Sequence, residues 1–437
     1  MTKPRIKMSA DLCDFPDRFT NEDGDGAPAL IEGRIYQRPR QAVILAGGRG
    51  TRMQPITNDR PKPMVPVLGH PFLEYQIRQL KNQGFERVLI LLGYLPEVVQ
   101  DYFGDGSKWG IEIEYSVTAP DQLTSSRVAA ARHLIDRCFL LLYCDNYWPL
   151  QMDRLWARFR EAKKPGLITV YSNKDGYSRG SVALDGEGHV RIFDRQRLAT
   201  GLQGVEISYA IITDLCLDLL PDHDTLFEEA IYTPLAAQRR LAAYPTDHRY
   251  YSVGSLERLP VTEAFFRRDP TIILDRDGVL NCKPPPAQYV RQWDEWEWCP
   301  GALEALRLLR QGGYRTVIAS NQPGVGRGLM TNDDLDTIHQ YMKKEAAQAG
   351  GRIDAVYCCT HGWHDDCECR KPRAGLLYQA QRDLHLDLTR TPYVGDDERD
   401  EQAAVAAGCP FLRVHDKQSL LDISRQLVEM KGSPIYA

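Results

Sequence analysis

Short, uninterrupted apolar runs alternate with amphipathic segments of helical period along most of the sequence. AVILA (42–46) and RVLILLG (87–93) in the first half have counterparts in the second half, TIILD (271–275) and RTVIASN (315–321). Strands that are buried on both faces lack a polar alternation, and parallel sheets covered by helices contain such strands. The pattern therefore predicts an α/β fold with two domains, each a mostly parallel sheet flanked by helices.

The domain boundaries follow from the places where this pattern begins and pauses. The alternation starts near residue 39 and is interrupted by FFRRDP at 265–270, where charges and a proline form a short linker. We therefore expect a first domain over 39–265, a linker over 266–269 and a second domain over 270–437. Residues 1–38 are polar and show no clear period, which predicts an N-terminal arm or a disordered leader.

Composition limits the function classes that are open to this chain. The net charge of −5 arises from both signs mixed along the sequence, without a basic stripe, so we expect no nucleic-acid partner. No apolar signal segment or bilayer-spanning run is present in the sequence, which predicts a cytoplasmic protein with no membrane partner. Eleven cysteines include four within 358–369, and in a cytosolic enzyme this crowding favours metal binding over disulfides. The sequence leaves open whether the chain forms a homo-oligomer.

Polar residues follow the apolar segments of the second half at Asp275 and Asp277, at Ser320 and Asn321, at Lys371, and at Asp396. The carboxyl ends of parallel strands border one crevice, so we expect these side chains to lie together. Phosphoryl transfer needs a nucleophile, an acid for the leaving oxygen, and positive charge, which aspartates, a lysine and Mg²⁺ supply. Any one of these residues alone is more simply an ordinary loop residue. The ordered set predicts a phosphoryl-transfer site.

This set resembles the haloacid dehalogenase-like phosphatases, over residues 270–425. The resemblance implies that Asp275 is the nucleophile and Asp277 the general acid/base. It also implies that Ser320 and Lys371 hold the phosphoryl group, that Asn321 and Arg370 bind substrate, and that Asp275, Asp277 (through its backbone carbonyl) and Asp396 bind Mg²⁺. Two nearby acids have more modest expected roles. Asp397 is expected behind the metal ligands, and Asp400 is expected to cap the next helix.

A cysteine- and histidine-rich segment, YCCTHGWHDDCECRKP, ends with Arg370, Lys371 and a proline. Three thiolates and one imidazole form a closed tetrahedral zinc set with no open position, so we expect a structural Zn²⁺ held by Cys359, His361, Cys367 and Cys369. Cys358 and His364 are alternative ligands. The zinc would fix the loop that carries Arg370 and Lys371.

The zinc segment, together with DRDGVLN and SNQPGVGRG, resembles the heptose-1,7-bisphosphate 7-phosphatase and histidinol-phosphate phosphatase subfamily. In that group the segment KPPPAQYVRQWDEWEW would line the substrate mouth. Its aromatic residues Tyr289, Trp293, Trp296 and Trp298 either stack on a sugar or pack the loop. We expect packing for most of them.

The first half contains LAGGRGTR, in which glycines stand where a strand turns into a helix. Backbone N–H groups at such a turn bind phosphates, and glycine allows the close approach that this requires. The candidate nucleotide-binding residues are Gly47, Gly48, Gly50, Thr51 and Arg52. Arg52 and Lys62 are also the candidate catalytic cations of this half.

LAGGRGTR and the following PKPMVPVLGHPFLEYQI resemble the sugar-1-phosphate nucleotidyltransferases, which have a Rossmann-like fold, over about residues 40–262. The resemblance implies that Asp145 binds Mg²⁺ and that Asp194 and Arg195 stand for the sugar-binding pair of the family. Where the family usually has a second metal-binding aspartate this chain has Ser252, with Asp247 nearby. The family's LGTAG segment is LTSSR here, which leaves the base preference open.

Together the two halves predict a bifunctional enzyme of nucleotide-activated heptose biosynthesis. The second domain would remove the 7-phosphate of D-glycero-D-manno-heptose 1,7-bisphosphate. The first would join the 1-phosphate to a nucleotidyl unit from a nucleoside triphosphate, with GTP favoured by the resemblance, and release pyrophosphate. The alternatives are a phosphatase with a regulatory nucleotidyltransferase-like module, or both activities on another sugar, polyol or histidinol phosphate.

Overall fold

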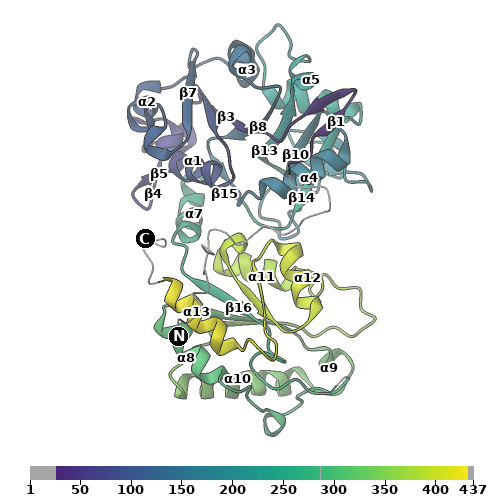
Figure 1. Ribbon diagram of the computed structural model, residues 1–437. Helices are drawn as coiled ribbons and strands as arrows, with labels where there is room; N and C mark the ends of the chain where they lie inside the picture. The colour runs from purple at the N-terminus through teal and green to yellow at the C-terminus, as the bar shows by residue number, and fades with distance from the viewer. Residues whose placement is uncertain (1–25, 286, 432–437) are drawn as a thin grey trace, which may run out of the picture. The chain divides into compact units, whose positions relative to one another are not determined.

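A computed structural model describes residues 26–285 and 287–431, which divide into two compact units. The first unit ends at Arg267 and the second begins at Arg268. Each unit contains one central sheet with helices on both of its faces (Figure 1). This arrangement confirms the predicted α/β class with two domains.

The first unit has a seven-stranded sheet in the order β14-β10-β13-β8-β3-β6-β7. Its strands are β3 (Gln41–Ala46), β6 (Arg87–Leu92), β7 (Glu112–Val117), β8 (Cys138–Tyr143), β10 (Gly166–Tyr171), β13 (Val205–Thr213) and β14 (Leu241–Thr246). Neighbouring strands are parallel, except that β13 is antiparallel to both β8 and β10. Its helices include α1 (Phe72–Asn82), α2 (Pro96–Phe103), α3 (Thr124–Ala130), α4 (Met152–Ala162), α5 (Asp214–Leu217), α6 (Thr233–Ala237) and α7 (Leu259–Phe266).

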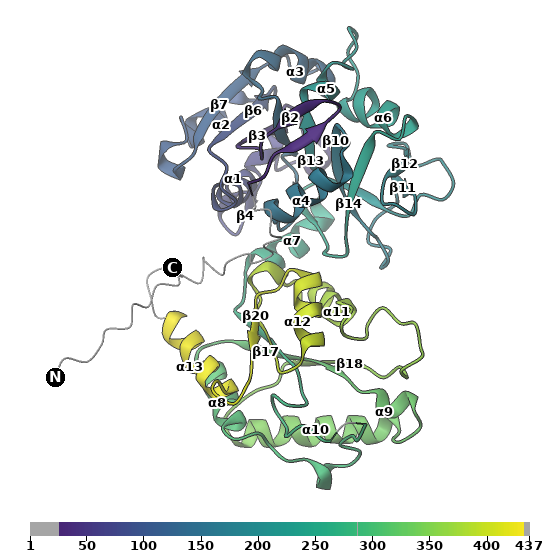
Figure 2. The same ribbon diagram turned by 45° about the vertical axis from the view of Figure 1, so that its right-hand side comes forward.

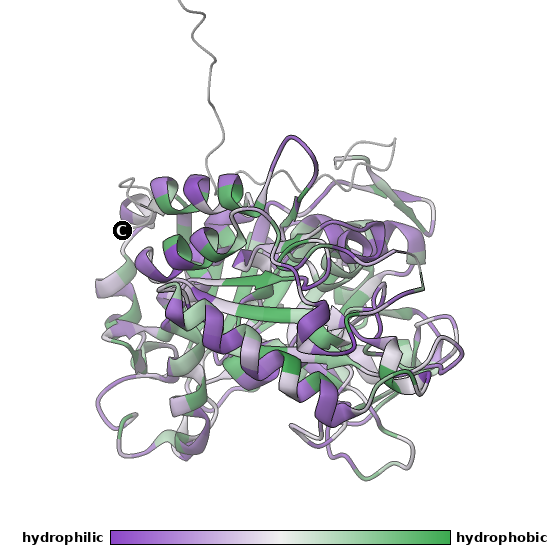
Figure 3. Cartoon of the chain, turned by 90° about the horizontal axis from the view of Figure 1, so that it is seen from below, coloured by the Kyte–Doolittle hydropathy of each residue, from purple (hydrophilic) through white to green (hydrophobic). Residues whose placement is uncertain are grey.

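Strand β3 shows why its sequence has no polar alternation. Ile44 packs into the apolar cluster under α1, α2 and α4, whereas Val43 and Leu45 pack into the cluster on the opposite face, under α3, α5 and α6. Both faces of the strand are therefore buried, as the continuous apolar run predicted. Figure 3 shows the hydrophobic colour concentrated on the sheet strands.

The expected N-terminal leader is shorter than 38 residues. Strands β1 (Ala29–Ile31) and β2 (Arg34–Tyr36) form an antiparallel hairpin. Ala29, Ile31 and Tyr36 are buried in the same cluster as α1 and α4, and the Tyr36 hydroxyl donates to Asp214. The prediction of an arm is therefore wrong for residues 29–36, because alternate side chains of this short hairpin are apolar and buried. Residues 1–25 lie outside the described residues.

The second unit has a five-stranded, fully parallel sheet in the order β18-β17-β16-β19-β20. Its strands are β16 (Thr271–Leu274), β17 (Arg315–Asn321), β18 (Ala355–Cys359), β19 (Tyr393–Gly395) and β20 (Phe411–Arg413). Its helices include α8 (Ala302–Gln311), α9 (Pro323–Gly326), α10 (Asn332–Gln348), α11 (Gly375–Leu384), α12 (Glu398–Ala407) and α13 (Leu420–Lys431). Helices α8, α10 and α13 cover one face and α11 and α12 the other (Figure 2). Across both described stretches of the chain, no helix is both long and apolar enough to cross a bilayer.

Candidate active sites

A cavity of about 250 Å³ lies at the carboxyl ends of β16 and β17 in the second unit. The predicted residues that line it are Asp275, Asp277, Ser320, Asn321, Arg370 and Lys371. They come from segments up to about 100 residues apart, and the parallel sheet places their strand ends side by side. The structure thus brings the predicted phosphoryl-transfer residues into one site.

Lys371 is the central cation of this cavity. Its Nζ lies 2.8 Å from Asp275 Oδ1 and 2.6 Å from Asp400 Oδ1, and it donates to the Ala319 carbonyl (3.0 Å) and the Tyr393 hydroxyl (2.9 Å). Burial raises the pKa of Asp275 to about 7, although the charge of Lys371 opposes this rise. Burial opposes protonation of Lys371, but the charge of Asp275 holds the pKa of Lys371 well above the usual range. The candidate nucleophile is therefore a buried carboxylate that depends on one lysine for its charge balance.

Asp277 is held in a separate network. It accepts hydrogen bonds from Gln322 Nε2 (2.7 Å), Asn281 Nδ2 (2.9 Å) and Arg276 Nη2 (3.1 Å). Burial opposes ionisation, but the charge of Arg276 and these hydrogen bonds hold the pKa of Asp277 below its usual range. Gln322 also donates to Ser320 Oγ (2.9 Å) and accepts from Arg276 Nη2 (2.8 Å), so it joins two predicted residues. The sequence analysis gave Arg276 and Gln322 no role, although both stand inside its motifs.

The carboxylates that could hold a divalent ion are Asp275, Asp396 and Asp400, whose nearest oxygens lie within 4.8 Å of one another. The side chain of Asp277 does not belong to this group, and its predicted contact with the metal is through its backbone carbonyl. Asp400 is an addition to the predicted set of ligands. Asp396 Oδ1 is buried and has no hydrogen-bond partner among the described residues, as expected of an oxygen that binds a cation. An all-oxygen set of this kind fits Mg²⁺.

The next helix, α12, is capped by two neighbouring acids, of which only Asp400 was expected to cap it. Asp397 is the N-cap of α12, and Asp400 at the N3 position completes a capping box with it. Lys283, which the sequence analysis missed, has its Nζ 2.7 Å from Asp396 Oδ2 and 3.2 Å from Asp397 Oδ2. Lys283 and Arg399 both line the cavity and add positive charge at its mouth.

Asn321 lines the cavity, and it also makes a contact that was not predicted. Its amide group donates to the backbone carbonyl of Lys371 and accepts from the backbone N–H of Lys371, both at 3.0 Å. These two bonds fix the Lys371 loop to the end of β17, so Asn321 positions Lys371. Arg370 Nη1 donates to the carbonyl of His361 (2.9 Å), which connects the cavity to the cysteine-rich segment.

Packing explains most aromatic residues of the segment between Lys283 and Trp298. Trp293, Trp296 and Trp298 pack against the cluster under α8 and α10, and Trp298 Nε1 donates to Glu345 (2.8 Å). Tyr289 lines the cavity. Trp363, which the sequence analysis did not select, also lines the cavity and is 51% exposed.

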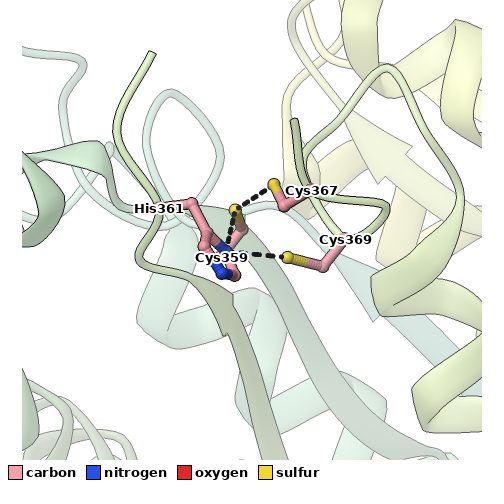
Figure 4. Close-up of side chains that lie close together, drawn as sticks. All are labelled: Cys359, His361, Cys367 and Cys369. Atoms are coloured by element: carbon pink, nitrogen blue, oxygen red, sulfur yellow. Dashed lines mark hydrogen bonds between the residues drawn. The ribbon is translucent and has the colours of Figure 1, made fainter. Parts of the chain in front are cut away.

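The four predicted zinc ligands lie together at the end of β18 (Figure 4). Cys359 Sγ is 3.7 Å from Cys367 Sγ and 3.6 Å from His361 Nδ1, and Cys369 Sγ is 3.2 Å from His361 Nδ1. A tetrahedral zinc ion with bonds of about 2.3 Å to sulfur and about 2.0 Å to nitrogen separates its ligands by roughly 3.5–3.8 Å. The donor set and its spacing therefore fit Zn²⁺.

The two alternative zinc ligands lie outside this group. Cys358 Sγ is 3.8 Å from His339 Nε2 instead, because successive side chains of a strand point to opposite faces. Among the described residues, His364 is not one of the clustered ligands.

A second cavity of about 210 Å³ lies in the first unit and is lined by Arg52, Asp145 and Ser252, together with Asn146, Ser178, Arg197, Val205, Glu206, Tyr250, Gly254, Ser255 and Arg258. Lys62 forms an ion pair with Asp145 Oδ2 beside it. The Ser252 hydroxyl accepts a hydrogen bond from the Gly254 N–H (2.9 Å), so it is already engaged. The structure thus joins Arg52, Lys62 and Asp145 as predicted.

The glycine-rich loop adjoins these residues through two close contacts. A Cβ on Gly47 would lie 2.3 Å from the Arg127 guanidinium carbon, and a Cβ on Gly50, whose φ is +65°, would lie 3.1 Å from Lys62 Cβ. A side chain at position 47 would displace the Arg127 guanidinium, and the left-handed backbone at position 50 favours glycine. Gly48 faces open space, and Thr51 lies in the short helix η2 (Thr51–Met53). Arg127 belongs to the LTSSR segment and was not selected from the sequence.

The predicted sugar-binding pair is not brought into the cavity. The Asp194 carboxylate accepts hydrogen bonds from the backbone N–H groups of residues 196–199 and so stabilises its own turn. Arg195 Nε lies 3.4 Å from Glu228 Oε1. Asp247, considered as a substitute metal ligand, pairs with Lys174 at 3.1 Å. Neither Asp194, Arg195 nor Asp247 lines this cavity.

Comparisons with known proteins agree with two units of different kinds. A family described as nucleotidyl transferase matches residues 41–194, and one described as polynucleotide kinase 3 phosphatase matches residues 270–408. The chain is 45% identical, over 142 residues, to D-glycero-beta-D-manno-heptose-1,7-bisphosphate 7-phosphatase of Bordetella bronchiseptica, which covers 32% of this chain and 78% of the relative. It is 35% identical, over 161 residues, to D-glycero-alpha-D-manno-heptose-1,7-bisphosphate 7-phosphatase of Campylobacter jejuni. This match covers 37% of this chain and 91% of the relative.

Two solved structures are similar to parts of the chain. The D,D-heptose 1.7-bisphosphate phosphatase of B. bronchiseptica, complexed with magnesium and phosphate, is 37% identical with a TM-score of 0.35, and the match covers 37% of this chain and 98% of that one. HddC from Yersinia pseudotuberculosis, complexed with GMP-PN, is 22% identical with a TM-score of 0.43, and the match covers 52% of this chain and 99% of that one. The chain belongs to the heptose-1,7-bisphosphate 7-phosphatase family through its second unit, and its first unit carries a nucleotidyl transferase domain.

Proposed function

We propose that the chain is a bifunctional, cytoplasmic enzyme of nucleotide-activated heptose biosynthesis. Its second unit removes the 7-phosphate of D-glycero-D-manno-heptose 1,7-bisphosphate. Its first unit joins the product, heptose 1-phosphate, to a nucleotidyl group and releases pyrophosphate, and GTP is the favoured donor. The observation that carries this proposal is the Asp275–Lys371 pair at 2.8 Å beside Asp277, in a unit that is 45% identical to a heptose-bisphosphate phosphatase.

In the phosphatase unit, an Asp275 carboxylate oxygen attacks the phosphorus atom and the bond from phosphorus to the sugar oxygen breaks. Asp277 gives a proton to the leaving oxygen and then takes one from the water that hydrolyses the aspartyl-phosphate. The negative charge of the bound phosphate favours the protonated form of Asp277, against the low pKa that Arg276 and its hydrogen bonds give it without substrate. Ser320 and Lys371 hold the phosphoryl oxygens. Gln322 fixes Asp277 and Ser320 relative to each other through hydrogen bonds of 2.7 and 2.9 Å.

Two metal ions are part of the proposal. Asp275, Asp396 and the backbone carbonyl of Asp277 would hold Mg²⁺, which neutralises charge on the phosphoryl oxygens. Cys359, His361, Cys367 and Cys369 would hold a structural Zn²⁺, which has no open position for substrate. The Arg370 side chain bonds to the His361 carbonyl, so this zinc would set the position of the arginine that faces substrate.

In the transferase unit, the glycine-rich loop with Arg52 would bind the triphosphate, and Asp145 would hold Mg²⁺. Lys62 lies against Asp145 and supplies a cation near the phosphorus under attack. The phosphate oxygen of the sugar attacks the α-phosphorus and pyrophosphate leaves. Positioning and charge neutralisation supply most of the rate.

The decisive experiment is a mass-spectrometric assay of the purified chain with Mg²⁺, each anomer of heptose 1,7-bisphosphate, and each nucleoside triphosphate in turn. An NDP-heptose formed with one base supports both activities and identifies the donor. Asp275→Asn should stop the reaction from the bisphosphate and leave the reaction from heptose 1-phosphate intact. Formation of NDP-heptose from the bisphosphate by this variant would refute the nucleophile assignment.

One observation favours a second candidate, a phosphatase whose nucleotidyltransferase-like unit only binds nucleotide. The cavity of the first unit offers Asp145 as a metal carboxylate. The position of the family's second metal-binding aspartate holds Ser252, whose hydroxyl is engaged by the Gly254 N–H. A hydroxyl is a weaker Mg²⁺ ligand than a carboxylate. Accumulation of heptose 1-phosphate with every triphosphate would favour this candidate, and release of phosphate only from histidinol phosphate or another polyol phosphate would change the substrate.

A further inference from the structure

The cavity of the first unit contains a carboxyl group that has no role in the assignments above. Glu206, at the start of β13, lines this cavity together with Arg52 and Asp145. Among the described residues, its carboxylate accepts one hydrogen bond, from the Ser208 N–H to Oε1 at 2.6 Å. The side chain is partly exposed, and because it lines the cavity its second oxygen is available to a ligand there.

The backbone next to Glu206 is held in an unusual conformation. Ser208 has a φ of +71° in the middle of β13, in the left-handed region that serine rarely adopts. Its hydroxyl accepts a hydrogen bond from Asn146 Nδ2 at 2.8 Å. Asn146 follows Asp145 directly, so this bond fixes Glu206 relative to the candidate metal ligand. A side chain fixed in this way is preorganised for binding.

Glu206 suits a neutral hydrogen-bonding role. Burial, and then the charge of Glu228, raise the pKa of Glu206 to about 8. Glu228 is 7% exposed, and its Oε2 is buried with no hydrogen-bond partner among the described residues. A carboxyl group that is uncharged at neutral pH both donates and accepts hydrogen bonds. It also does not repel a phosphate, for which Arg197 and Arg258 add positive charge to the same cavity as Arg52.

We propose that Glu206 is a specificity-determining residue of nucleotidyl transfer, which hydrogen-bonds a hydroxyl group of the sugar 1-phosphate bound in this cavity. The inference rests on the proposed function and adds the residue that recognises the sugar. A sugar phosphate offers hydroxyl groups at one end and a phosphate at the other, and the cavity offers a carboxyl group and arginines. A site built to bond a substrate hydroxyl rejects an analogue that lacks it, because the buried polar group of the protein is then left unpaired.

The test measures pyrophosphate release by the full chain with saturating nucleotide and varied sugar 1-phosphate. Glu206→Ala should raise the KM for the sugar phosphate about tenfold or more and change the KM for the nucleotide less than about twofold. Glu206→Gln keeps a neutral hydrogen-bonding group and should restore the sugar KM to within about threefold of wild type. Glu187→Gln, whose side chain is 83% exposed, is the matched control and should behave as wild type.

Deoxy analogues of the sugar phosphate separate recognition from a structural role. When the bonded hydroxyl is absent from the substrate, the kcat/KM of wild type should fall about tenfold or more. The kcat/KM of Glu206→Ala should be nearly the same for the deoxy analogue and for the complete sugar phosphate, because the variant has already lost this hydrogen bond. An unchanged sugar KM in Glu206→Ala, or an equal rise in the nucleotide KM, would overturn the inference while the proposed function stands. If Glu206→Ala does not fold, Glu206→Asp decides by the same criteria. A wild-type chain that makes no nucleotide sugar overturns the proposed function and this inference together.

Discussion

Asp275→Asn should abolish phosphate release and at the same time stabilise the second unit. Asp275, Asp396 and Asp400 face two ammonium groups, those of Lys371 and Lys283. The cluster therefore has one excess negative charge when no divalent ion is bound. Asparagine has nearly the same shape as aspartate, and Lys371 keeps its contact with Asp400, so the fold should tolerate the change.

The size of this effect follows from the spacing of the charges. Two carboxylate pairs within 4.8 Å each cost at least about 3.5 kcal/mol at an effective dielectric constant of about 20, and the attraction at 2.8 Å to Lys371 returns about 6 kcal/mol. Removing the charge of Asp275 therefore gains about 1 kcal/mol, and relief of its burial adds to this. The raised pKa of Asp275, about 7, has the same sign, because ionising this carboxyl group costs more free energy in the folded than in the unfolded state, and this cost is fully present above about pH 7.

Scanning calorimetry at pH 7.5 in magnesium-free buffer measures this gain. The transition of the second unit should move up by about 2–4 °C for each 1 kcal/mol, and that of the first unit should not move. Asp336→Asn, at an exposed position of α10, is the matched control and should change stability by less than about 0.5 kcal/mol. A variant less stable than wild type would refute the charge argument. Retained turnover would refute the role of Asp275 as nucleophile.

Further predictions concern other parts of the chain. Elemental analysis should find about one zinc per chain, since a structural site binds one ion tightly, and Cys367→Ser should lose it; zinc-free wild type would exclude this site. Asp145→Asn should stop nucleotide-sugar formation while phosphate release continues, and equal activity of variant and wild type in the coupled assay would rule out Asp145 as the metal ligand. Gln322→Ala should lower the kcat of phosphate release about 10²-fold or more by freeing Asp277, with KM less affected; an unchanged kcat would show that Asp277 is positioned without it. Burial, and then the charge of Arg276, lower the pKa of His339 to about 3, so the folded state holds this imidazole neutral while the unfolded state takes up a proton below about pH 6.5. From pH 6.5 to 5.5 the second unit of the wild type should therefore lose about 1 kcal/mol of stability relative to His339→Gln, whatever other titrating groups contribute to both proteins; urea titrations in which the two proteins change equally with pH would contradict the assignment.

The sequence was most informative where function depends on local order along the chain. The Asp275-x-Asp277 motif follows a strand whose two faces are buried, so its position at a strand end could be predicted from the apolar run alone. The four zinc ligands lie within 11 residues of one another, and the spacing of Cys367 and Cys369 alone restricts where their sulfur atoms can lie. In both cases the backbone geometry of a short segment limits where the side chains lie.

The roles of individual side chains around these motifs required the tertiary structure. Asn321 follows Ser320 directly, yet its amide bonds the backbone of Lys371, 50 residues later. Asp194 resembles a sugar-binding residue in sequence, yet four backbone N–H groups of its own turn bind it. A carboxylate or an amide can form the same hydrogen bonds with a ligand or with the protein backbone. Which of the two it bonds depends on the backbone groups that the folded chain places beside it.

By itself, therefore, the sequence determined two α/β units, a phosphoryl-transfer motif in the second and a nucleotide-binding loop in the first. Apolar periodicity and short motifs are local properties, and they act through backbone geometry that every chain shares. Only the tertiary structure decided that Asp400 joins Asp275 at Lys371, that Gln322 holds Asp277, and that Glu206 lines the same cavity as Arg52 and Asp145. Those arrangements depend on which distant strand ends meet and on which polar groups remain unpaired after the sheet has formed.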